Sequence, residues 1–512
     1  MLPLTAVPPR PRPAPPSPAL GLDGLGEVHG LLGEIIDTVA AARRPAGPVP
    51  AGTPADVLAA AAEALGPPRL PDEGLGAKAA LQRLTAVLVE QGLDLAHPRA
   101  AAHLQPPPLA VAIAADTLAS AGNASLDTYD SGPAAIAVER WLIAALTGLA
   151  GLGDGADGVL TPGGSLSNLM GLLLARDAAA LRLGIDVREQ GVAALPAPVV
   201  FCSEYAHFST HRACATLGLG EAAVRTVPAD EHRRMRPEAL AAALASLSPG
   251  QTPVAVVATA GTTDFGSVDP LARIAEIAAD HGMWTHVDAA YGFGALFSDR
   301  LADRLTGLDL ADSVTLDLHK LGWQPAAASA LLVADGRAFT AFDREVAYLN
   351  PADDTEAGYD GLLGRSLQTT RRPDAVKAAA TLLAYGRTGL GRMVDTCHDL
   401  ARHAERRILA EPELELVSPA ELTTVVFRYR GGADPADADA LNGAVRRRLL
   451  QSGSALIGRT EAPAGEPGAP HRVCLKFTLL NPAATADDID DLVDTVLDAG
   501  RTCERLTEET AA

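Results

Sequence analysis

Short apolar runs alternate with helical patterns through the middle of the chain. The predicted strands are Gly158–Thr161, Pro198–Cys202, Ala223–Val227, Val254–Ala258, Trp284–Val287, Ser313–Leu316 and Ala328–Val333. Helices are predicted at Ala134–Thr147, Ser167–Leu183 and Pro270–His281. Strands that alternate with helices are typical of an α/β fold with a mainly parallel sheet, covered by helices on both faces. Ligands bind such sheets at the carboxyl ends of the strands.

The segments on either side of this region have other patterns. Helices are predicted at Leu22–Ala42 and Pro54–Leu65, after a proline-rich start. Beyond Arg372 a long helix is predicted to about Ala410, and strands at Thr423–Tyr429 and Arg472–Thr478 flank a helix at Ala436–Gln451. We therefore predict a disordered proline-rich tail over residues 1–20, a helical segment over 21–125, a large α/β domain over 126–375 and a small α+β domain over 376–512.

Composition narrows the possible partners and locations. The net charge of -21 and the absence of a long basic cluster argue against a nucleic-acid partner. The five cysteines never form a Cys-x-x-Cys pair, which argues against a disulfide framework or a zinc site and fits a reducing cytoplasm. We find no apolar run of about 18 residues and no secretion signal, so neither a membrane span nor export is expected.

Lysine is rare in this chain. Of the 42 basic residues only four are lysines, at positions 78, 320, 377 and 476. Lysine can lose its proton and attack a carbonyl, which arginine cannot do near neutral pH. A lysine within an apolar stretch therefore invites a chemical explanation, although a lysine with an apolar stem and an exposed ammonium is the simpler alternative.

Two segments at strand ends carry candidate functional residues, and the first of them is suited to binding an anion. Thr161–Asn168 reads Thr-Pro-Gly-Gly-Ser-Leu-Ser-Asn, in which Gly163 and Gly164 let backbone N–H groups approach a phosphate and Ser165 adds a hydroxyl. A plain turn with a helix cap is the alternative. His207 follows the strand that ends near Cys202, where a lone histidine is more often structural.

Two later strands deliver an acid and a lysine. Asp288 emerges from the strand Trp284–Val287, where an unpaired carboxylate would be costly, so a buried cation such as a protonated pyridine nitrogen is a natural partner. His319 and Lys320 follow the strand Ser313–Leu316. An amine, an acid and a phosphate cradle form the set that pyridoxal phosphate needs. A metal site built on His286, Asp288 and His319 is the rival, but no His-x-x-x-His spacing supports it.

These motifs resemble the group II pyridoxal-phosphate decarboxylases of the aspartate aminotransferase-like fold (fold type I), over roughly His97 to Leu497. The resemblance implies a seven-stranded sheet, Lys320 as the Schiff-base lysine and Asp288 as the partner of the pyridine nitrogen. The remaining roles that it implies are His207 on the ring face, Thr263 near the ring or the substrate carboxylate, Gly163, Gly164 and Ser165 on the phosphate, and His319 on phosphate or substrate.

The resemblance also implies a proton donor on a loop and a homodimer. Tyr348 occupies the place of the tyrosine that returns a proton to the carbanion, although it could merely pack within the loop. Such loops close from the neighbouring subunit, which implies active sites at the dimer interface. Asp317 departs from the pattern, because many relatives carry an asparagine there that contacts phosphate. The aromatic residue common after the lysine is displaced to Trp323.

The substrate is less well defined by the sequence. The chain looks closest to the bacterial branch that acts on diamino acids, namely 2,4-diaminobutyrate, lysine or ornithine. Asp127 and Asp130 are candidates to hold a distal ammonium, or are surface acids near a turn. An aromatic or acidic amino acid remains an alternative substrate. An aldehyde synthase or aminotransferase on the same fold remains an alternative activity, and a non-enzymatic interaction protein would lack the cofactor.

Overall fold

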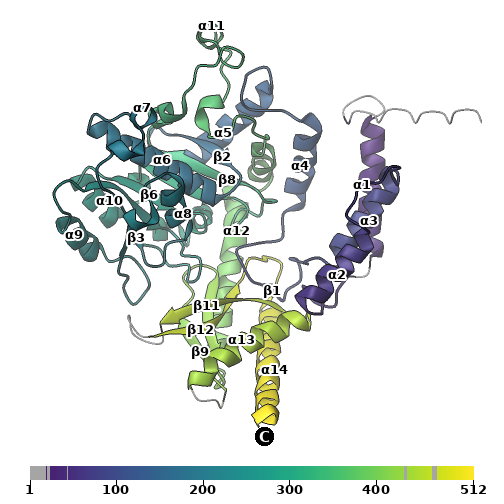
Figure 1. Ribbon diagram of the computed structural model, residues 1–512. Coiled ribbons are helices and arrows are strands. Elements are labelled where there is room, and N and C mark those ends of the chain that lie inside the picture. The colour runs from purple at the N-terminus through teal and green to yellow at the C-terminus, as the bar shows by residue number, and fades with distance from the viewer. Residues whose placement is uncertain (1–18, 20–23, 43, 432–434, 464–469, 512) are drawn as a thin grey trace, which may run out of the picture. The chain divides into compact units, whose positions relative to one another are not determined.

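The computed structural model describes residues 19, 24–42, 44–431, 435–463 and 470–511 (Figure 1). The chain forms two compact units. One comprises the residues up to Arg44 together with Leu58–Gly92, and the other comprises Pro45–Val57 and Leu93–Ala512. The tail predicted over residues 1–20 lies outside the described residues except for Ala19.

Helices make up the smaller unit. Helix α1 (Gly24–Ala41) packs against α3 (Ala77–Glu90), and Lys78 Nζ of α3 lies 2.5 Å from Glu34 Oε1 of α1. Helix α2 spans Pro54–Leu65, with the residues from Leu58 onward in this unit, so the two helices predicted near the N-terminus are confirmed. Helix α3 was not predicted from the sequence.

A seven-stranded sheet forms the centre of the larger unit (Figure 1). Its strand order is β2-β8-β7-β6-β5-β3-β4. The bounds are β2 Asp157–Thr161, β3 Pro198–Ser203, β4 Val224–Val227, β5 Thr252–Thr259, β6 Trp284–Asp288, β7 Ser313–Asp317 and β8 Ser329–Val333. Only β8 pairs antiparallel to its neighbours, β2 and β7. The predicted mainly parallel, seven-stranded α/β fold is confirmed.

Alternating strand residues supply the cores on the two faces of this sheet. In β8, Ala330 and Leu332 join one buried cluster while Leu331 and Val333 join the other. Helices α5 (Pro133–Leu149), α9 (Pro237–Ala245) and α10 (Leu271–Asp280) contribute to the first cluster. Helices α6 (Gly164–Arg182) and α8 (Ser209–Thr216) contribute to the second. The period of two along each strand thus buries both faces.

A smaller sheet and two helices form the C-terminal part of this unit. The strand order is β1-β11-β12-β10-β9. The elements are β1 Ala100–Ala101, β9 Leu414–Ser418, β10 Thr424–Tyr429, α13 Pro435–Gln451, β11 Leu456–Pro463, β12 His471–Thr478 and α14 Ala486–Ala511. Strands β10 and β12 match the predicted pair, whereas β1, β9 and β11 were missed.

One long helix connects these parts, and a shorter helix packs on it. Helix α12 (Ala375–Leu409) has 35 residues and contains a kink at Gly386, where φ is 61°. Glycine adopts this left-handed conformation without the penalty of a Cβ atom. Helix α4 (Ala110–Gly122) packs on α12. Within the described residues, no helix combines the length and the apolar content needed to cross a membrane.

Helix α6 lies close to the sheet because it carries a glycine at one point of contact. A Cβ atom built on Gly171 would lie 2.5 Å from Cε1 of His286, a fully buried residue of β6. The backbone of α6 can therefore approach the imidazole ring only without a side chain at this position.

We expect Gly171→Ala to reduce the free energy of unfolding by about 1–3 kcal/mol, because the ring or the helix must shift to admit the methyl group. Equilibrium urea unfolding measures this. Gly148→Ala is the matched control, since Gly148 lies on an exposed face of α5 with nothing within 4 Å of the added atom. An unchanged stability of the Gly171 variant would contradict the packing described here.

Candidate active site

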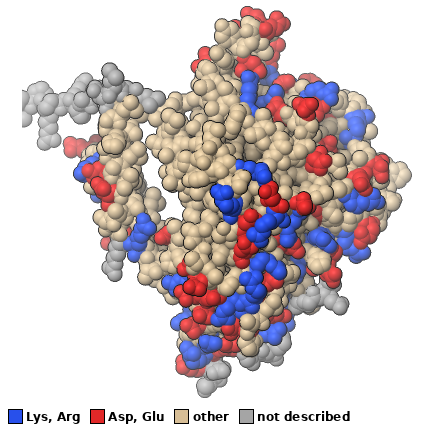
Figure 2. All heavy atoms as spheres, turned by 180° about the vertical axis from the view of Figure 1, so that it is seen from behind, with Lys and Arg blue, Asp and Glu red and all other residues tan. Residues whose placement is uncertain are grey.

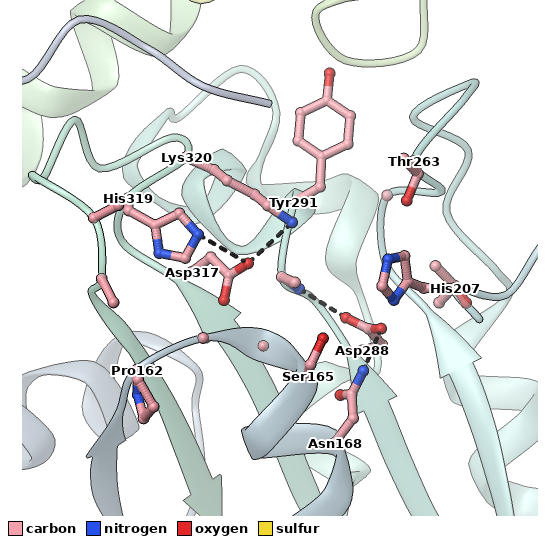
Figure 3. Close-up of a pocket in the computed structure, with 17 residues that line it drawn as sticks. Pro162, Ser165, Asn168, His207, Thr263, Asp288, Tyr291, Asp317, His319 and Lys320 are labelled. Atoms are coloured by element: carbon pink, nitrogen blue, oxygen red, sulfur yellow. Dashed lines mark hydrogen bonds and ion pairs between the residues drawn. The ribbon is translucent and has the colours of Figure 1, made fainter. Parts of the chain in front are cut away.

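A cavity of about 290 Å³ opens at the carboxyl ends of β5, β6 and β7, beside the first turn of α6 (Figure 3). Eight of the nine residues predicted from the sequence to form the site line it: Gly163, Gly164, Ser165, His207, Thr263, Asp288, His319 and Lys320. Figure 3 shows His319 and Lys320 on one side of the cavity, with His207 and Thr263 on the other.

Lys320 reaches the cavity from the turn that follows β7. Its Nζ lies 2.9 Å from Asp317 Oδ2, and His319 Nε2 lies 3.6 Å from the same oxygen. Ser329 of β8 donates a hydrogen bond of 2.5 Å to Asp317 Oδ1. One carboxylate at the end of β7 therefore holds both residues that the sequence analysis selected in this segment.

Asp317 faces the cavity, although the departure from the family pattern left open whether it turns away. A Cβ atom on Gly164 would lie 2.9 Å from Asp317 Oδ1, so the carboxylate adjoins the first turn of α6. Its negative charge is balanced there by Lys320. The position at which an anion would approach the helix thus already has an acidic neighbour and a lysine beside it.

Asp288 is a buried carboxylate at the end of β6, with 6% of its surface exposed. Asn168 Nδ2 donates to its Oδ2 at 2.8 Å, and the backbone N–H of Ala290 donates to its Oδ1 at 3.1 Å. These two donors offset part of the cost of burying the carboxylate. Asp288 also lines the cavity, where a cationic ligand atom could approach it.

A chain of hydrogen bonds orients Asn168. Trp284 Nε1 donates to Ser313 Oγ at 2.8 Å, so the Ser313 hydroxyl is free to donate to His286 Nδ1, also at 2.8 Å. The remaining ring nitrogen of His286, Nε2, then donates to Asn168 Oδ1 at 3.0 Å. This leaves the amide nitrogen of Asn168 to donate towards Asp288. Burial lowers the pKa of His286 to about 4, so the ring is neutral, as this chain requires.

The amide of Asn168 also orients the imidazole ring of His207, through the hydroxyl of Ser209. Asn168 Nδ2 also donates to Ser209 Oγ at 2.9 Å, and the Ser209 hydroxyl lies 2.8 Å from His207 Nδ1. The hydroxyl can therefore donate to Nδ1, which places the proton of a neutral His207 on Nε2. Burial lowers the pKa of His207, while the nearby Asp288 carboxylate raises it in part.

The first turn of α6 offers two backbone donors to the cavity. The helix begins at Gly164, but its first internal bond runs from Leu166 N–H to Gly163 O at 2.9 Å. The N–H groups of Gly164 and Ser165 therefore have no acceptor within the helix. The helix starts three residues before the predicted Ser167, which moves both residues from a loop into the positive end of the helix.

The C-terminal sheet holds the segment that carries Thr263. Lys476 Nζ of β12 donates to the Thr263 carbonyl at 3.3 Å and lies 2.7 Å from Asp264 Oδ1. The hydroxyl of Tyr291, another residue of the cavity, lies 2.7 Å from Thr423 Oγ1. One wall of the cavity is thus fixed by residues of the C-terminal sheet and of the segment before β10.

Three predicted residues lie elsewhere in the chain. Tyr348 has 84% of its surface exposed and lines a separate groove with Leu349 and Gln368. Asp127 and Asp130 lie on the loop before α5 and are absent from the lining of the Lys320 cavity. A single chain therefore brings neither the expected proton donor nor the expected ammonium-binding acids to Lys320.

Sequence reasoning overlooked Asn168 and gave His286 only a metal-binding alternative. A signal existed for Asn168, which lies on the same helix face as Gly164 and Gly171, three or four residues away. A polar residue on the buried face of an apolar helix requires a partner. Which partner it finds depends on how the helix docks on the sheet, and this the sequence does not reveal.

Comparison with known proteins identifies the family. A model of the pyridoxal-dependent decarboxylase conserved domain matches residues 61–430. The chain belongs to this decarboxylase family. It is accordingly a carboxy-lyase that uses pyridoxal phosphate to decarboxylate an amino acid. The resemblance noted in the sequence to the group II decarboxylases is confirmed.

Curated relatives in the family share the sequence over most of its length. The L-2,4-diaminobutyrate decarboxylase of Rhizobium meliloti (strain 1021) is 41% identical over 85% of this chain and 84% of its own. That of Acinetobacter baumannii is 37% identical over 83% and 84%. An acidic amino acid decarboxylase of Mus musculus is 32% identical over 76% and 71%.

Solved structures of decarboxylases share the fold. The glutamate decarboxylase domain of a Vibrio parahaemolyticus protein described as a diaminobutyrate–pyruvate transaminase and L-2,4-diaminobutyrate decarboxylase superposes with a TM-score of 0.82, at 31% identity, over 94% of this chain and 96% of that one. An Oryza sativa structure solved with pyridoxal phosphate and tryptamine also gives 0.82, at 24% identity, over 94% and 99%. The second likeness supports the fold alone.

The cavity of this decarboxylase fits its cofactor. It combines an amine at Lys320, a buried carboxylate at Asp288 and backbone donors at the start of α6. These are the groups that an aldehyde, a ring nitrogen and a phosphate require. Asn168 and Ala290 leave part of Asp288 facing the cavity, which suits a charged ring nitrogen.

The depressed pKa of His286 predicts a pH-dependent stability. Below its ordinary pKa of 6.5 the unfolded chain takes up a proton that the folded state refuses until about 4. Stability is therefore lost as the pH falls through this window.

We expect the fall in the free energy of unfolding between pH 7 and pH 5 to be about 2 kcal/mol smaller in His286→Gln than in the wild type. Urea unfolding at the two pH values measures it. His232→Gln, at an exposed histidine, is the control and should keep the wild-type difference. Equal pH dependence in all three proteins would show that His286 is not buried as a neutral ring.

Proposed function

We propose that this decarboxylase converts L-2,4-diaminobutyrate to the corresponding diamine and CO₂, with pyridoxal phosphate attached to Lys320. The observation that carries the proposal is the placement of Lys320 and Asp288 in one cavity, at the ends of adjacent strands and beside the first turn of α6. Two L-2,4-diaminobutyrate decarboxylases, 41% and 37% identical, support the choice of substrate.

The residues of the cavity divide the tasks of binding the cofactor. Lys320 would supply the amine for its aldehyde, and Asp288 would hold the ring nitrogen in its protonated form. His207, whose orientation follows from Ser209, would cover one face of the ring, with Thr263 beside the ring or the substrate carboxylate. When bound, pyridoxal phosphate takes up the electron pair that the departing CO₂ leaves behind.

The phosphate would lie at the start of α6. Gly163 and Gly164 leave room for it, and the N–H groups of Gly164 and Ser165 would donate to it. His319 would contact the phosphate or the substrate from the opposite side, and Asp317 would keep Lys320 near the aldehyde before the covalent bond forms.

We expect Lys320→Ala to lose the imine band of the bound cofactor between 300 and 500 nm, because no other amine lines the cavity within the described residues. The wild type should release CO₂ from 2,4-diaminobutyrate with a kcat/KM about tenfold or more above that for ornithine, since one methylene group is worth roughly 10–200-fold.

A panel with lysine, ornithine, glutamate, tyrosine and tryptophan distinguishes the alternatives. Release from glutamate or from an aromatic substrate alone would replace the proposed substrate with an acidic or aromatic one. A cofactor band without CO₂ from any of them would point to aminotransfer, and peroxide formed together with CO₂ would indicate an aldehyde synthase. Absence of the band in the wild type would refute the proposal.

We further propose that the enzyme is a cytoplasmic homodimer whose sites include Tyr348 of the second chain. One face of the molecule carries a wide area with few charged side chains (Figure 2). Helices α4, α5 and α12 expose large apolar side chains, among them Ile113, Leu118, Trp141 and Leu383. Tyr348 is exposed and outside its own cavity, so it is available to another chain. The absence of disulfide bonds among the five cysteines supports a reducing compartment.

The shared site can be tested by complementation. Tyr348→Phe removes the proton donor and should lower kcat by about 10²–10⁴-fold. Co-expression of Tyr348→Phe with Lys320→Ala should restore roughly a quarter of the wild-type activity, because mixed dimers then contain one intact site. Tyr359→Phe, another exposed tyrosine, is the control. If sedimentation shows that the co-expressed chains form dimers and no activity is recovered, Tyr348 does not belong to a shared site.

A further inference from the structure

Lys377 is a buried lysine that lines no part of the active-site cavity. It lies in the first turn of α12, and 2% of its side chain is exposed. It is also one of only four lysines among 42 basic residues, the others being arginine. A buried position that carries lysine instead of arginine therefore calls for an explanation.

The ammonium of Lys377 has three neighbours. Its Nζ lies 3.1 Å from Asp374 Oδ1 and 3.6 Å from Asp116 Oδ1, and it donates a hydrogen bond of 3.0 Å to the carbonyl of Ala327. Arg372 contacts both of these carboxylates, at 2.5 Å and 2.7 Å. Lys377 and Arg372 therefore bind the same two carboxylates, whereas the hydrogen bond to Ala327 comes from Lys377.

The carbonyl that Lys377 holds belongs to the wall of the active site. Ala326 and Ala327 both line the cavity, a few residues after Lys320. Thr381, one helical turn beyond Lys377, accepts a hydrogen bond of 2.9 Å from Gln324 Nε2. Residues four apart lie on one helix face, so this face of α12 holds the segment after Lys320 at two points.

A short chain of contacts links Ala327 to Lys320. The next residue, Ala328, accepts the backbone N–H of His319 at 3.1 Å, and its carbonyl lies 3.0 Å from His319 Nδ1. His319 and Lys320 share Asp317, at 3.6 Å and 2.9 Å. A shift of Ala327 would thus move the His319 imidazole, and with it the Asp317 carboxylate that holds the ammonium of Lys320.

We propose that Lys377 is a positioning residue of the decarboxylase, which fixes the cavity wall at Ala327 and through it the arrangement of His319, Asp317 and Lys320. The inference rests on the proposed function in one respect, the attachment of pyridoxal phosphate at Lys320.

The test compares Lys377→Met with Arg372→Gln in the full-length enzyme. Both variants remove one cation from the cluster around Asp116 and Asp374, but Arg372 contacts Asp116, Ser120 and Asp374 and no residue of the cavity. Pyridoxal phosphate is removed and then titrated back, with its affinity read from the absorption between 300 and 500 nm. Thermal unfolding and the split between kcat and KM are measured in parallel.

We expect Lys377→Met to weaken cofactor binding about tenfold, corresponding to roughly one lost hydrogen bond at a charged group. Its kcat should fall while KM for the substrate changes little. Arg372→Gln should lower the unfolding temperature to a similar degree but leave cofactor affinity within about twofold of the wild type. Lys377→Arg, which retains a donor and a charge, should recover part of the affinity.

Two results would overturn the inference. Equal cofactor affinities in Lys377→Met and the wild type would show that the contact with Ala327 does not influence cofactor binding. Equal losses of cofactor affinity in the Lys377 and Arg372 variants would show that the effect of Lys377 is one of general stability. Should Lys377→Met not fold, Thr381→Val decides, since it keeps the charges and the volume while releasing Gln324. A loss of about threefold supports the positioning role and no loss refutes it. A wild type without the cofactor band would instead refute the proposed function.

Discussion

A carboxylate buried at the end of a central strand constrains much of this structure. Asp288 requires hydrogen-bond donors, and it receives them from Ala290 and from Asn168 on the helix above the sheet. His286 binds the oxygen of Asn168 and so turns its amide nitrogen towards Asp288. His286 fits under the helix because position 171 has no side chain. The docking of α6 on the sheet and the polarity of the cavity are therefore set by one connected requirement.

This requirement also explains why neutral and charged groups are arranged as they are. His286 is kept neutral by burial, which allows it to donate to an amide oxygen and accept from Ser313. The two carboxylates of the cavity then have separate environments. Asp288 is bound by neutral donors, whereas Asp317 is bound by Lys320 and the hydroxyl of Ser329. A cationic ring nitrogen and an amine would thus have distinct partners in a small space.

Three of the four lysines act on the walls of this cavity. Lys320 enters it, Lys377 binds the carbonyl of Ala327, and Lys476 binds the carbonyl of Thr263 from strand β12. A compact ammonium can meet a carbonyl in a confined site where the planar fork of arginine would need more room. Gly458 illustrates this limit, because a Cβ atom there would lie 3.0 Å from the Lys476 stem. The walls depend on helices and strands that are remote in sequence.

Residue patterns along the chain were enough to predict the strands of the large sheet and the chemistry at their ends. Apolar runs of a few residues specify buried strands locally. Asp288 could be selected because it ends one such strand, and Lys320 because it lies three residues after another. Strands β9 and β11 escaped prediction, since β9 has only its two terminal residues buried and β11 mixes apolar with charged positions, so neither forms a plain apolar run. The start of α6 was also placed too late, because Gly-Gly-Ser reads equally well as a turn.

The contacts between groups that are distant in the sequence became visible only in the folded chain. Asn168 and His286 are 118 residues apart, and Lys377 and Ala327 are 50 apart, so no local period or motif relates them. The tertiary structure also placed Tyr348 outside the cavity of its own chain, although its position in the sequence had suggested a part in the reaction. Hydrophobic periodicity is a property of neighbouring residues, whereas the contacts that orient a site depend on how whole elements dock, which is a property of the folded chain.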